Sequence, residues 1–141
     1  MSEHLESFKS FLKQRVKTSD AYLRGDAAPF LEICTKKSPA TFFSPGGALV
    51  EGAEKVAATH ESGAQIFESF DANKFETLHQ NADENIAYWV GLQKSIVTMK
   101  VKKDAVPMTI RVTEIFRREN DEWKIIHRHA DFLKEEKKEK E

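Results

Sequence analysis

The second half of the chain constrains the fold most, because it consists of long β-type segments that follow one another directly. These segments are rich in β-branched and aromatic residues and cover 75–82, 86–101, 108–117 and 123–132. The connections between them contain NADEN, KKDAVP and END, which are short and polar, as hairpin connections are. The sequence therefore predicts a meander of long antiparallel strands, and strand twist should curve the sheet strongly.

The first half of the chain is predicted to be mainly helical. Over 5–23, apolar residues recur with helical spacing at Leu5, Phe8, Leu12, Val16 and Leu23. Gly25 is expected to end this helix, and Asp26 to cap a short second helix. A strand fragment is expected over 40–43, and the turn-rich link GGALVEG leads to a third helix over 53–70. The buried stripe of this third helix is predicted to comprise Val56, His60, Ala64 and Phe67.

Three helices followed by a strand meander define an α+β fold. The expected shape is a cone, in which a strongly curved antiparallel sheet is covered on its concave face by the three N-terminal helices. A cone of this kind has room for a small molecule at its centre. Its outer face is expected to bury the apolar residues of 86–101 and 123–132 in a homodimer.

Length, charge and cysteine content narrow the class of protein. With 141 residues, the chain is expected to form one domain over 1–133, followed by a charged, flexible tail over 134–141. The net charge of −1 argues against a nucleic-acid partner, and no apolar run is long enough to span a membrane. The single cysteine, Cys34, is expected to fill the core and fits a reducing compartment, so a cytoplasmic location is predicted.

Glu114 is the most informative polar residue, because it interrupts the buried face of a strand. Its neighbours on that face are all apolar: Met108, Ile110, Val112 and Phe116. A carboxylate in this position needs a basic partner or becomes protonated. A two-residue hairpin loop over 120–121 would place His127 opposite Glu114. A bulge or a three-residue loop would shift the parity and place Arg128 there instead.

The acid–base pair at Glu114 admits three interpretations. It is a buried structural pair, a group that orients a ligand or moves a proton, or part of a metal site. A metal site would use His127 and His129, completed by Glu114 or Asp131, because His-x-His on a strand aims both imidazoles to one side. We predict no metal and no cofactor for this chain.

Other polar residues are assigned by their position in the expected elements. His60 lies on the inner stripe of the third helix, where it either reaches the pocket or packs in the core. Tyr88 and Trp89 alternate along a strand, so one of them faces the cavity. The charges of the first helix are expected to be solvent-exposed, and these are Arg15, Lys17 and Arg24.

The stretch AYLRGDAAPFLEICTKKSPATFFSPGGALVEG resembles the N-terminal signature of SnoaL-like proteins, a group within the nuclear transport factor 2-like superfamily. The stretches IAYWVGLQ and VTEIFRRENDEWKIIHRHADF resemble the closing strands of that family. The segments ALVEG, IAY and DEWKIIHRH are similar to the association domain of calcium/calmodulin-dependent kinase II. This resemblance covers 5–132 and implies the cone fold with a central pocket.

The resemblance also implies positions to compare with known sites. Ketosteroid isomerases of this superfamily use a tyrosine and two aspartates, and the matching positions here are Thr18, Ser44 and Glu114. Because a serine cannot act as a carboxylate base, steroid isomerase chemistry is not expected. The kinase association domain has pocket arginines at positions that match Glu114 and Ala130, so its cationic site is not expected at those positions.

The sequence thus predicts a small-molecule-binding protein with a hydrophobic pocket inside the cone and a small hydrophobic or polar organic ligand. The predicted ligand-binding residues are His60, Trp89, Glu114, Phe116 and Arg128. The alternative is an enzyme of the isomerase, dehydratase or hydrolase type. In that case Glu114 and a histidine, with His127 and His129 as candidates, would act as acid and base.

Overall fold

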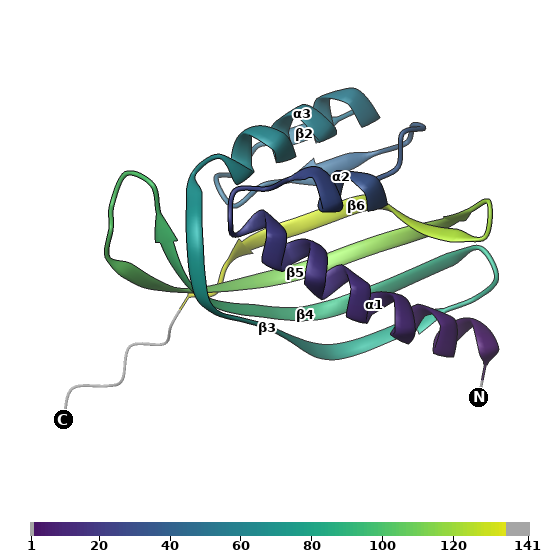
Figure 1. The fold of residues 1–141 in the computed structure, drawn as a ribbon. Helices are drawn as coiled ribbons and strands as arrows, with labels where there is room; N and C mark the ends of the chain where they lie inside the picture. The colour runs from purple at the N-terminus through teal and green to yellow at the C-terminus, as the bar shows by residue number, and fades with distance from the viewer. Residues whose placement is uncertain (1, 135–141) are drawn as a thin grey trace.

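The computed structural model describes residues 2–134 and places the helices on one side of a single sheet (Figure 1). The helices of this region are α1 (Glu3–Tyr22), α2 (Ala28–Ile33) and α3 (Ala53–Ala64). Its strands are β1 (Thr41–Phe43), β2 (Leu49–Glu51), β3 (Phe67–Ala82), β4 (Ile86–Met99), β5 (Ala105–Glu119) and β6 (Glu122–Phe132). The predicted α+β fold is confirmed, with a curved sheet that does not close into a barrel.

The sheet has the strand order β2-β1-β6-β5-β4-β3. The strands β3 to β6 form the predicted antiparallel meander. The short strand β1 departs from the prediction, because it runs parallel to β6 and forms a hairpin with β2. This arrangement pairs the edge of β6, whose backbone groups would otherwise lack partners. The GGALVEG link therefore contains a strand that the sequence analysis did not predict.

The third helix is shorter than predicted. It ends at Ala64 rather than at 70, and β3 begins at Phe67. Phe67 is buried, as predicted, but it belongs to a strand and lies opposite Met99 of β4. The apolar spacing of 64 and 67 is compatible with both a helix and a strand end, and long pairing with β4 favours the strand. The strand β5 also extends beyond the predicted range of 108–117 at both ends.

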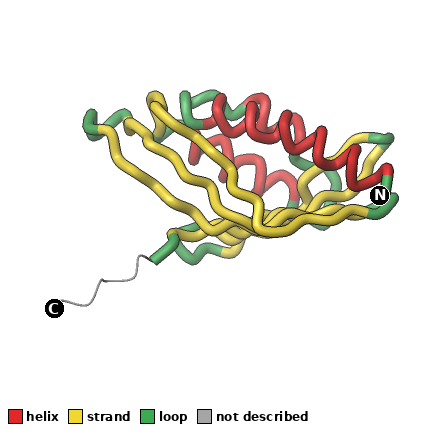
Figure 2. Tube along the Cα trace, turned by 90° about the horizontal axis from the view of Figure 1, so that it is seen from below, coloured by secondary structure: helices red, strands yellow, loops and turns green. Residues whose placement is uncertain are grey.

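Irregular pairing curves the sheet around the helices. The register of β3 against β4 shifts between Phe67 and Ser69, between Phe70 and Ala72, and between Thr77 and His79. Each extra residue bends the strand and increases its twist. Figure 2 shows the outcome, with the helices on the concave side of the sheet and no described helix on the opposite side.

The hairpin between β5 and β6 combines both features that the sequence allowed as alternatives. Residues 120 and 121 have φ values of 49° and 64°, as in a two-residue type I′ turn. Farther along β6 the register shifts, because Ile126 is an extra residue without a partner on β5. As a result, Arg128 rather than His127 lies opposite Glu114.

An aromatic cluster connects α1 to the sheet. Phe8 is fully buried, and its ring lies 5.1 Å from that of Phe116 and 5.7 Å from that of Trp123. Cys34 belongs to the same core, as predicted, and burial raises the pKa of its thiol to about 12. The thiol is therefore protonated and packs as a small apolar group.

Three predictions concern the whole chain rather than its core. No helix within 2–134 is long and apolar enough to cross a membrane. The predicted tail over 134–141 lies outside the described residues, apart from Lys134. The cytoplasmic location stays a prediction from the single cysteine.

Gly91 marks a very close approach of β3 to β4. A Cβ atom added at Gly91 would lie 2.1 Å from the backbone oxygen of Glu76. We predict that Gly91→Ala lowers the free energy of unfolding by roughly 1–3 kcal/mol, because a backbone atom cannot turn aside as a side chain does. Urea denaturation measures this change.

Gly46→Ala is the matched control, because a Cβ atom added there meets nothing within 4 Å. We expect this second substitution to change the free energy of unfolding by less than about 0.5 kcal/mol. Equal effects of the two substitutions would contradict the close approach at Gly91.

Candidate functional site

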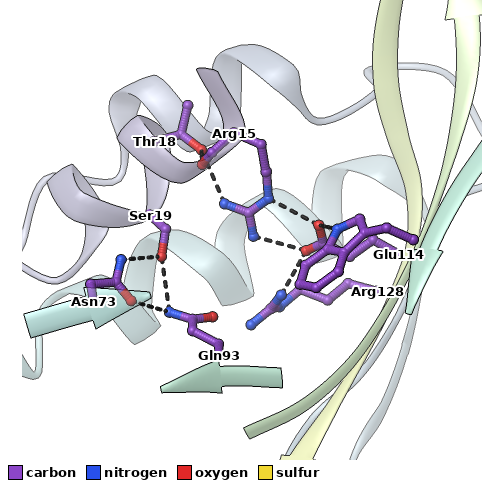
Figure 3. Close-up of polar contacts among 8 residues, drawn as sticks. Arg15, Thr18, Ser19, Asn73, Gln93, Glu114 and Arg128 are labelled. Atoms are coloured by element: carbon purple, nitrogen blue, oxygen red, sulfur yellow. Dashed lines mark hydrogen bonds and ion pairs between the residues drawn. The ribbon is translucent and has the colours of Figure 1, made fainter. Parts of the chain in front are cut away.

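A buried carboxylate on the concave face accepts four hydrogen bonds from three side chains (Figure 3). Arg15 donates from Nε to Glu114 Oε1 at 3.0 Å and from Nη2 to Oε2 at 2.8 Å. Trp89 Nε1 donates to Oε1 at 2.8 Å, and Arg128 Nη1 donates to Oε2 at 2.6 Å. The predicted bond between Glu114 and a basic residue of the last strand is confirmed, and that residue is Arg128.

These contacts keep Glu114 ionised. Burial by itself would raise the pKa of this carboxyl group. The charges of Arg15 and Arg128, with the hydrogen bonds from Arg15 and Trp89, outweigh burial and lower the pKa to about 2. At neutral pH the group therefore accepts hydrogen bonds and has no proton to donate.

Arg15 was predicted to be solvent-exposed, and this prediction is wrong. The residue is 2% exposed. Its Nη1 donates to Thr18 Oγ1 at 3.0 Å, and its guanidinium carbon lies 4.5 Å from the centre of the Phe30 ring. A signal was available in the sequence, because Arg15 lies two helical turns after Phe8 and one turn after Phe11, on the inward stripe of α1.

A cavity of about 310 Å³ lies beside this group, between the helices and the sheet. Most of its wall is apolar and includes Tyr22, Phe30, Phe67, Met99, Met108 and Ile110. The polar side chains that line it are those of Arg15, Ser19, His60, Gln93 and Arg128. A cavity of this size can hold a small organic molecule.

His60 lines the cavity and is packed between two aromatic rings. The centre of its imidazole lies 4.7 Å from that of the Phe30 ring and 4.4 Å from that of the Phe42 ring. Burial lowers the pKa of His60 to about 3, and the charges of Arg128 and Arg15 contribute to this shift. The imidazole is therefore neutral at physiological pH and adds no charge to the cavity.

The predicted ligand-binding residues fall into two groups. His60 and Arg128 line the cavity. Trp89, Glu114 and Phe116 are fully buried and do not line the cavity. A ligand in the cavity would therefore meet the arginines, and Glu114 would act on it only through them.

His127 and His129 lie on the opposite face of the sheet from Glu114. The Nδ1 atom of His127 is 2.7 Å from Thr41 Oγ1, and the Nε2 atom of His129 is 3.4 Å from Asp131 Oδ2. The extra residue in β6 causes this placement, because it turns Arg128 inward and the residues on either side of it outward. An acid–base pair or a metal site that combines Glu114 with either histidine does not fit this geometry.

The positions matched to ketosteroid isomerases do not form a catalytic group. Thr18 Oγ1 donates to the backbone oxygen of Arg15 at 2.6 Å. Ser44 lies in the connection between β1 and β2, where its Oγ accepts a hydrogen bond from the backbone nitrogen of Ala48. Ala130, which matches a kinase-domain arginine, is buried and lines the cavity. The positive charge of this cavity thus comes from other positions than in that domain.

A second polar group borders the cavity and was not predicted. Gln93 Nε2 donates to Ser19 Oγ at 2.9 Å and to Asn73 Oδ1 at 3.1 Å. A signal was present in β4, where Gln93 and Ser95 continue the inward-facing positions of Trp89 and interrupt an otherwise apolar series.

Comparison with known sequences identifies the family. The model of the SnoaL-like domain matches residues 16–133. The chain belongs to the SnoaL-like family. No curated protein matches this SnoaL-like chain significantly.

Solved structures with the SnoaL-like fold cover most of the chain. A ketosteroid isomerase-like protein from Erwinia carotovora atroseptica has a TM-score of 0.75 and 13% identity, over 96% of this chain and 100% of that one. A nuclear transport factor 2-like superfamily protein from Salmonella enterica has a TM-score of 0.71 and 12% identity, over 92% and 91% of the two chains.

The association domain of the calcium/calmodulin-dependent kinase II from C. elegans has a TM-score of 0.65 and 16% identity, over 89% of this SnoaL-like chain and 95% of that domain. The predicted resemblance to these groups is confirmed. At such identities the likeness shows a shared fold and carries no activity.

Replacing Glu114 by glutamine should strongly destabilise this SnoaL-like protein. The substitution leaves Arg15 and Arg128 without a buried counter-charge, and breaking a buried ion pair in this way costs roughly 3–5 kcal/mol.

The pH dependence of the free energy of unfolding should change too. The folded pKa of about 2 lies below the ordinary 4.5, so the stability from ionised Glu114 is present above pH 4.5 and is lost towards pH 2. Urea denaturation at several pH values should show a shallower acid dependence for the variant.

Asp131→Asn is the matched control for the acid-to-amide change. Asp131 also forms a two-bond pair with an arginine, but the side chain of that partner, Arg111, is 61% exposed. Exposed pairs are screened by water, so this variant should remain close to the wild type in stability. A loss as large as that of Glu114→Gln would indicate that burial of Glu114 is not the cause.

Proposed function

We propose that this SnoaL-like protein binds a small organic acid in the cavity beside Glu114, with the ligand carboxylate against Arg128. The observation that carries the proposal is a surplus of buried positive charge in a largely apolar cavity. An anion of suitable size would neutralise it.

The surplus follows from the ionisation states of the groups around the cavity. Arg15 and Arg128 each carry one positive charge, and Glu114 supplies one negative charge. His60 is neutral, and Tyr22 stays protonated because burial raises its pKa to about 12. Within the described residues these groups sum to one positive charge. A buried charge without a counter-ion is costly, and a ligand carboxylate would reduce that cost.

Arg128 is better placed than Arg15 to contact the ligand. Arg15 uses Nε and Nη2 on Glu114 and Nη1 on Thr18. Among the described residues, Arg128 donates only from Nη1, which leaves Nε and Nη2 for a ligand. The Arg128 side chain is 12% exposed, compared with 3% for Arg15. The geometry thus favours Arg128 as the direct contact and Arg15 as the residue that holds Glu114.

The remainder of the cavity favours an apolar body for the ligand. Its wall includes the rings of Phe30 and Phe67 and the thioethers of Met99 and Met108. Methionine side chains adapt to irregular shapes, which suits an aromatic or branched aliphatic group. The predicted hydrophobic or polar ligand is therefore narrowed to an amphipathic one, with an acid at one end.

The same geometry favours binding over the enzymatic alternative. A general acid or base works best with a pKa near the operating pH. Glu114 has a pKa of about 2, and His60 has one of about 3. His127 and His129 are separated from the cavity by the sheet. These features support a ligand-binding protein rather than an acid–base catalyst.

Arg128→Met should weaken acid binding without destabilising the protein. Arg15 would still pair with Glu114 through two hydrogen bonds, and the uncompensated charge would be gone. We expect the affinity for phenylacetate or hydrocinnamate to fall about tenfold or more, because a charge-assisted hydrogen bond is lost. Isothermal titration calorimetry measures the affinity, and thermal unfolding should show an unchanged or raised melting temperature.

Lys103→Met is the matched control, since it removes an equal charge from an exposed side chain that pairs with Glu68. This variant should bind both acids as the wild type does. Phenylacetamide, which keeps the apolar body but has no charge, should bind much more weakly than phenylacetate. Equal binding of acid and amide by the wild type would reject the proposed function.

We also propose that the outer face of the sheet, which is the side turned away from the helices, forms a homodimer. Apolar side chains at the outward positions of β4 and β5 support this, namely Val90, Leu92, Ile96 and Ile115. The expectation of apolar outward residues in 123–132 is wrong, because the outward positions of β6 carry Lys124, His127, His129 and Asp131. Ile96 is 39% exposed in the single chain. A stable interface would bury roughly 1,200–2,000 Å² in total.

Ile96→Lys should convert the proposed dimer into a monomer, because it places a charge in an apolar contact. Val101→Lys is the control, since Val101 is 97% exposed and lies in the connection between β4 and β5. Light scattering at micromolar concentration should give a dimer for the wild type and for Val101→Lys. A wild-type monomer would contradict the proposal.

A further inference from the structure

Gln93 lines the cavity and carries a buried hydrogen-bond acceptor that is unsatisfied. The residue is 3% exposed, and its Nε2 donates to Ser19 and Asn73. Its Oε1 is buried and has no hydrogen-bond partner among the described residues. Figure 3 shows this oxygen on the side of the carboxamide that is turned away from Ser19 and Asn73.

The orientation of the Gln93 amide is determined by a chain of hydrogen bonds that begins at Asp20. A carboxylate can only accept, so Asn73 must turn its Nδ2 towards Asp20 Oδ1, at 2.9 Å. Asn73 Oδ1 then faces the other way and accepts from Ser95 Oγ at 2.8 Å. Because that oxygen is an acceptor, Gln93 must offer it Nε2. Reversing the amide would place two oxygens against each other.

We propose that Gln93 Oε1 selects ligands with a neutral hydrogen-bond donor, so that the preferred ligand of this cavity is a hydroxy acid or an acid with an amide N–H. This inference rests on the proposed function and adds a second contact to it. Arg128 would bind the carboxylate of the ligand, and Gln93 Oε1 would accept a hydrogen bond from its neutral donor. Both side chains line the same cavity.

A neutral donor fits this position better than an ammonium group. The cavity already contains a surplus positive charge from Arg15 and Arg128, and a second cation would be repelled. A ligand without a hydrogen-bond donor would leave Gln93 Oε1 buried and unpaired, so it should bind more weakly. The ligand class is therefore anionic at one end and also carries a hydroxyl or an amide N–H.

The test compares acids that differ only by one hydroxyl group. Mandelate is paired with phenylacetate, and phenyllactate with hydrocinnamate. Each acid is titrated into the wild-type protein, and its affinity is measured by isothermal titration calorimetry. We expect the hydroxylated member of at least one pair to bind about threefold to tenfold more tightly, as one neutral hydrogen bond allows. Equal affinities within both pairs would overturn the role of Gln93 and leave the proposed function intact. Failure of all four acids to bind at millimolar concentration would overturn both.

Two variants assign the preference to a residue. Gln93→Met keeps the length of the side chain but removes the acceptor, so the ratio of affinities within each pair of acids should fall to about one, whatever the affinity for the acid without a hydroxyl. Ser95→Ala removes a hydrogen bond from the same Asn73 but does not line the cavity, and it should keep the preference. A preference that persists in Gln93→Met would overturn the assignment.

A crystal structure of the wild type with phenyllactate gives a readout that needs no variant. We expect the hydroxyl oxygen within hydrogen-bond distance of Gln93 Oε1 and the carboxylate at Arg128. A hydroxyl that points elsewhere, with only water on Gln93 Oε1, would overturn the inference even if Gln93→Met did not fold.

Discussion

The hydrogen-bonded group around Glu114 connects parts of the chain that are far apart in sequence. The carboxylate comes from β5, and its donors come from α1, β6 and β4. Two of the three donors pack against an aromatic ring: Arg15 lies against Phe30, and Trp89 stacks on Phe75 at a ring distance of 5.0 Å. Because the buried, ionised carboxylate accepts two hydrogen bonds from Arg15, α1 has little freedom to move relative to the sheet.

This group also determines the chemistry of the cavity. Two guanidinium groups share one carboxylate, so the buried ion pairs and the surplus positive charge arise from the same three residues, Arg15, Arg128 and Glu114. Arg15 donates from all three of its side-chain nitrogens to Glu114 and Thr18, whereas Arg128 donates to Glu114 from one nitrogen and lines the cavity. The stabilising and the ligand-facing roles are therefore divided between the two arginines, and Glu114 holds both in place.

Much of the fold could be predicted from local patterns. The content of β-branched and aromatic residues identified the strands after 75, and period-two alternation placed Glu114 on a buried face. The end of α3 could not be predicted, because Phe67 satisfies helical and extended spacing equally and only pairing with Met99 distinguishes them. Arg15 was missed because a charged residue was assigned to solvent without its partner, which is 99 residues away in the chain. The network of Gln93 and Asn73 likewise depends on contacts between a helix and two strands that no local pattern reveals.

The extra residue at Ile126 has a consequence for how such a cavity can change its ligand. In β6, arginine and histidine occupy neighbouring positions, and the bulge alone determines which of them faces inward. A continuous register from the 120–121 turn would bring His127 to Glu114 and turn Arg128 out. The sequence of β6 is thus compatible with two linings of the cavity. One contains the permanently charged Arg128, and the other would contain the titratable His127. A shift of register would exchange them without altering the identity of any side chain in β6.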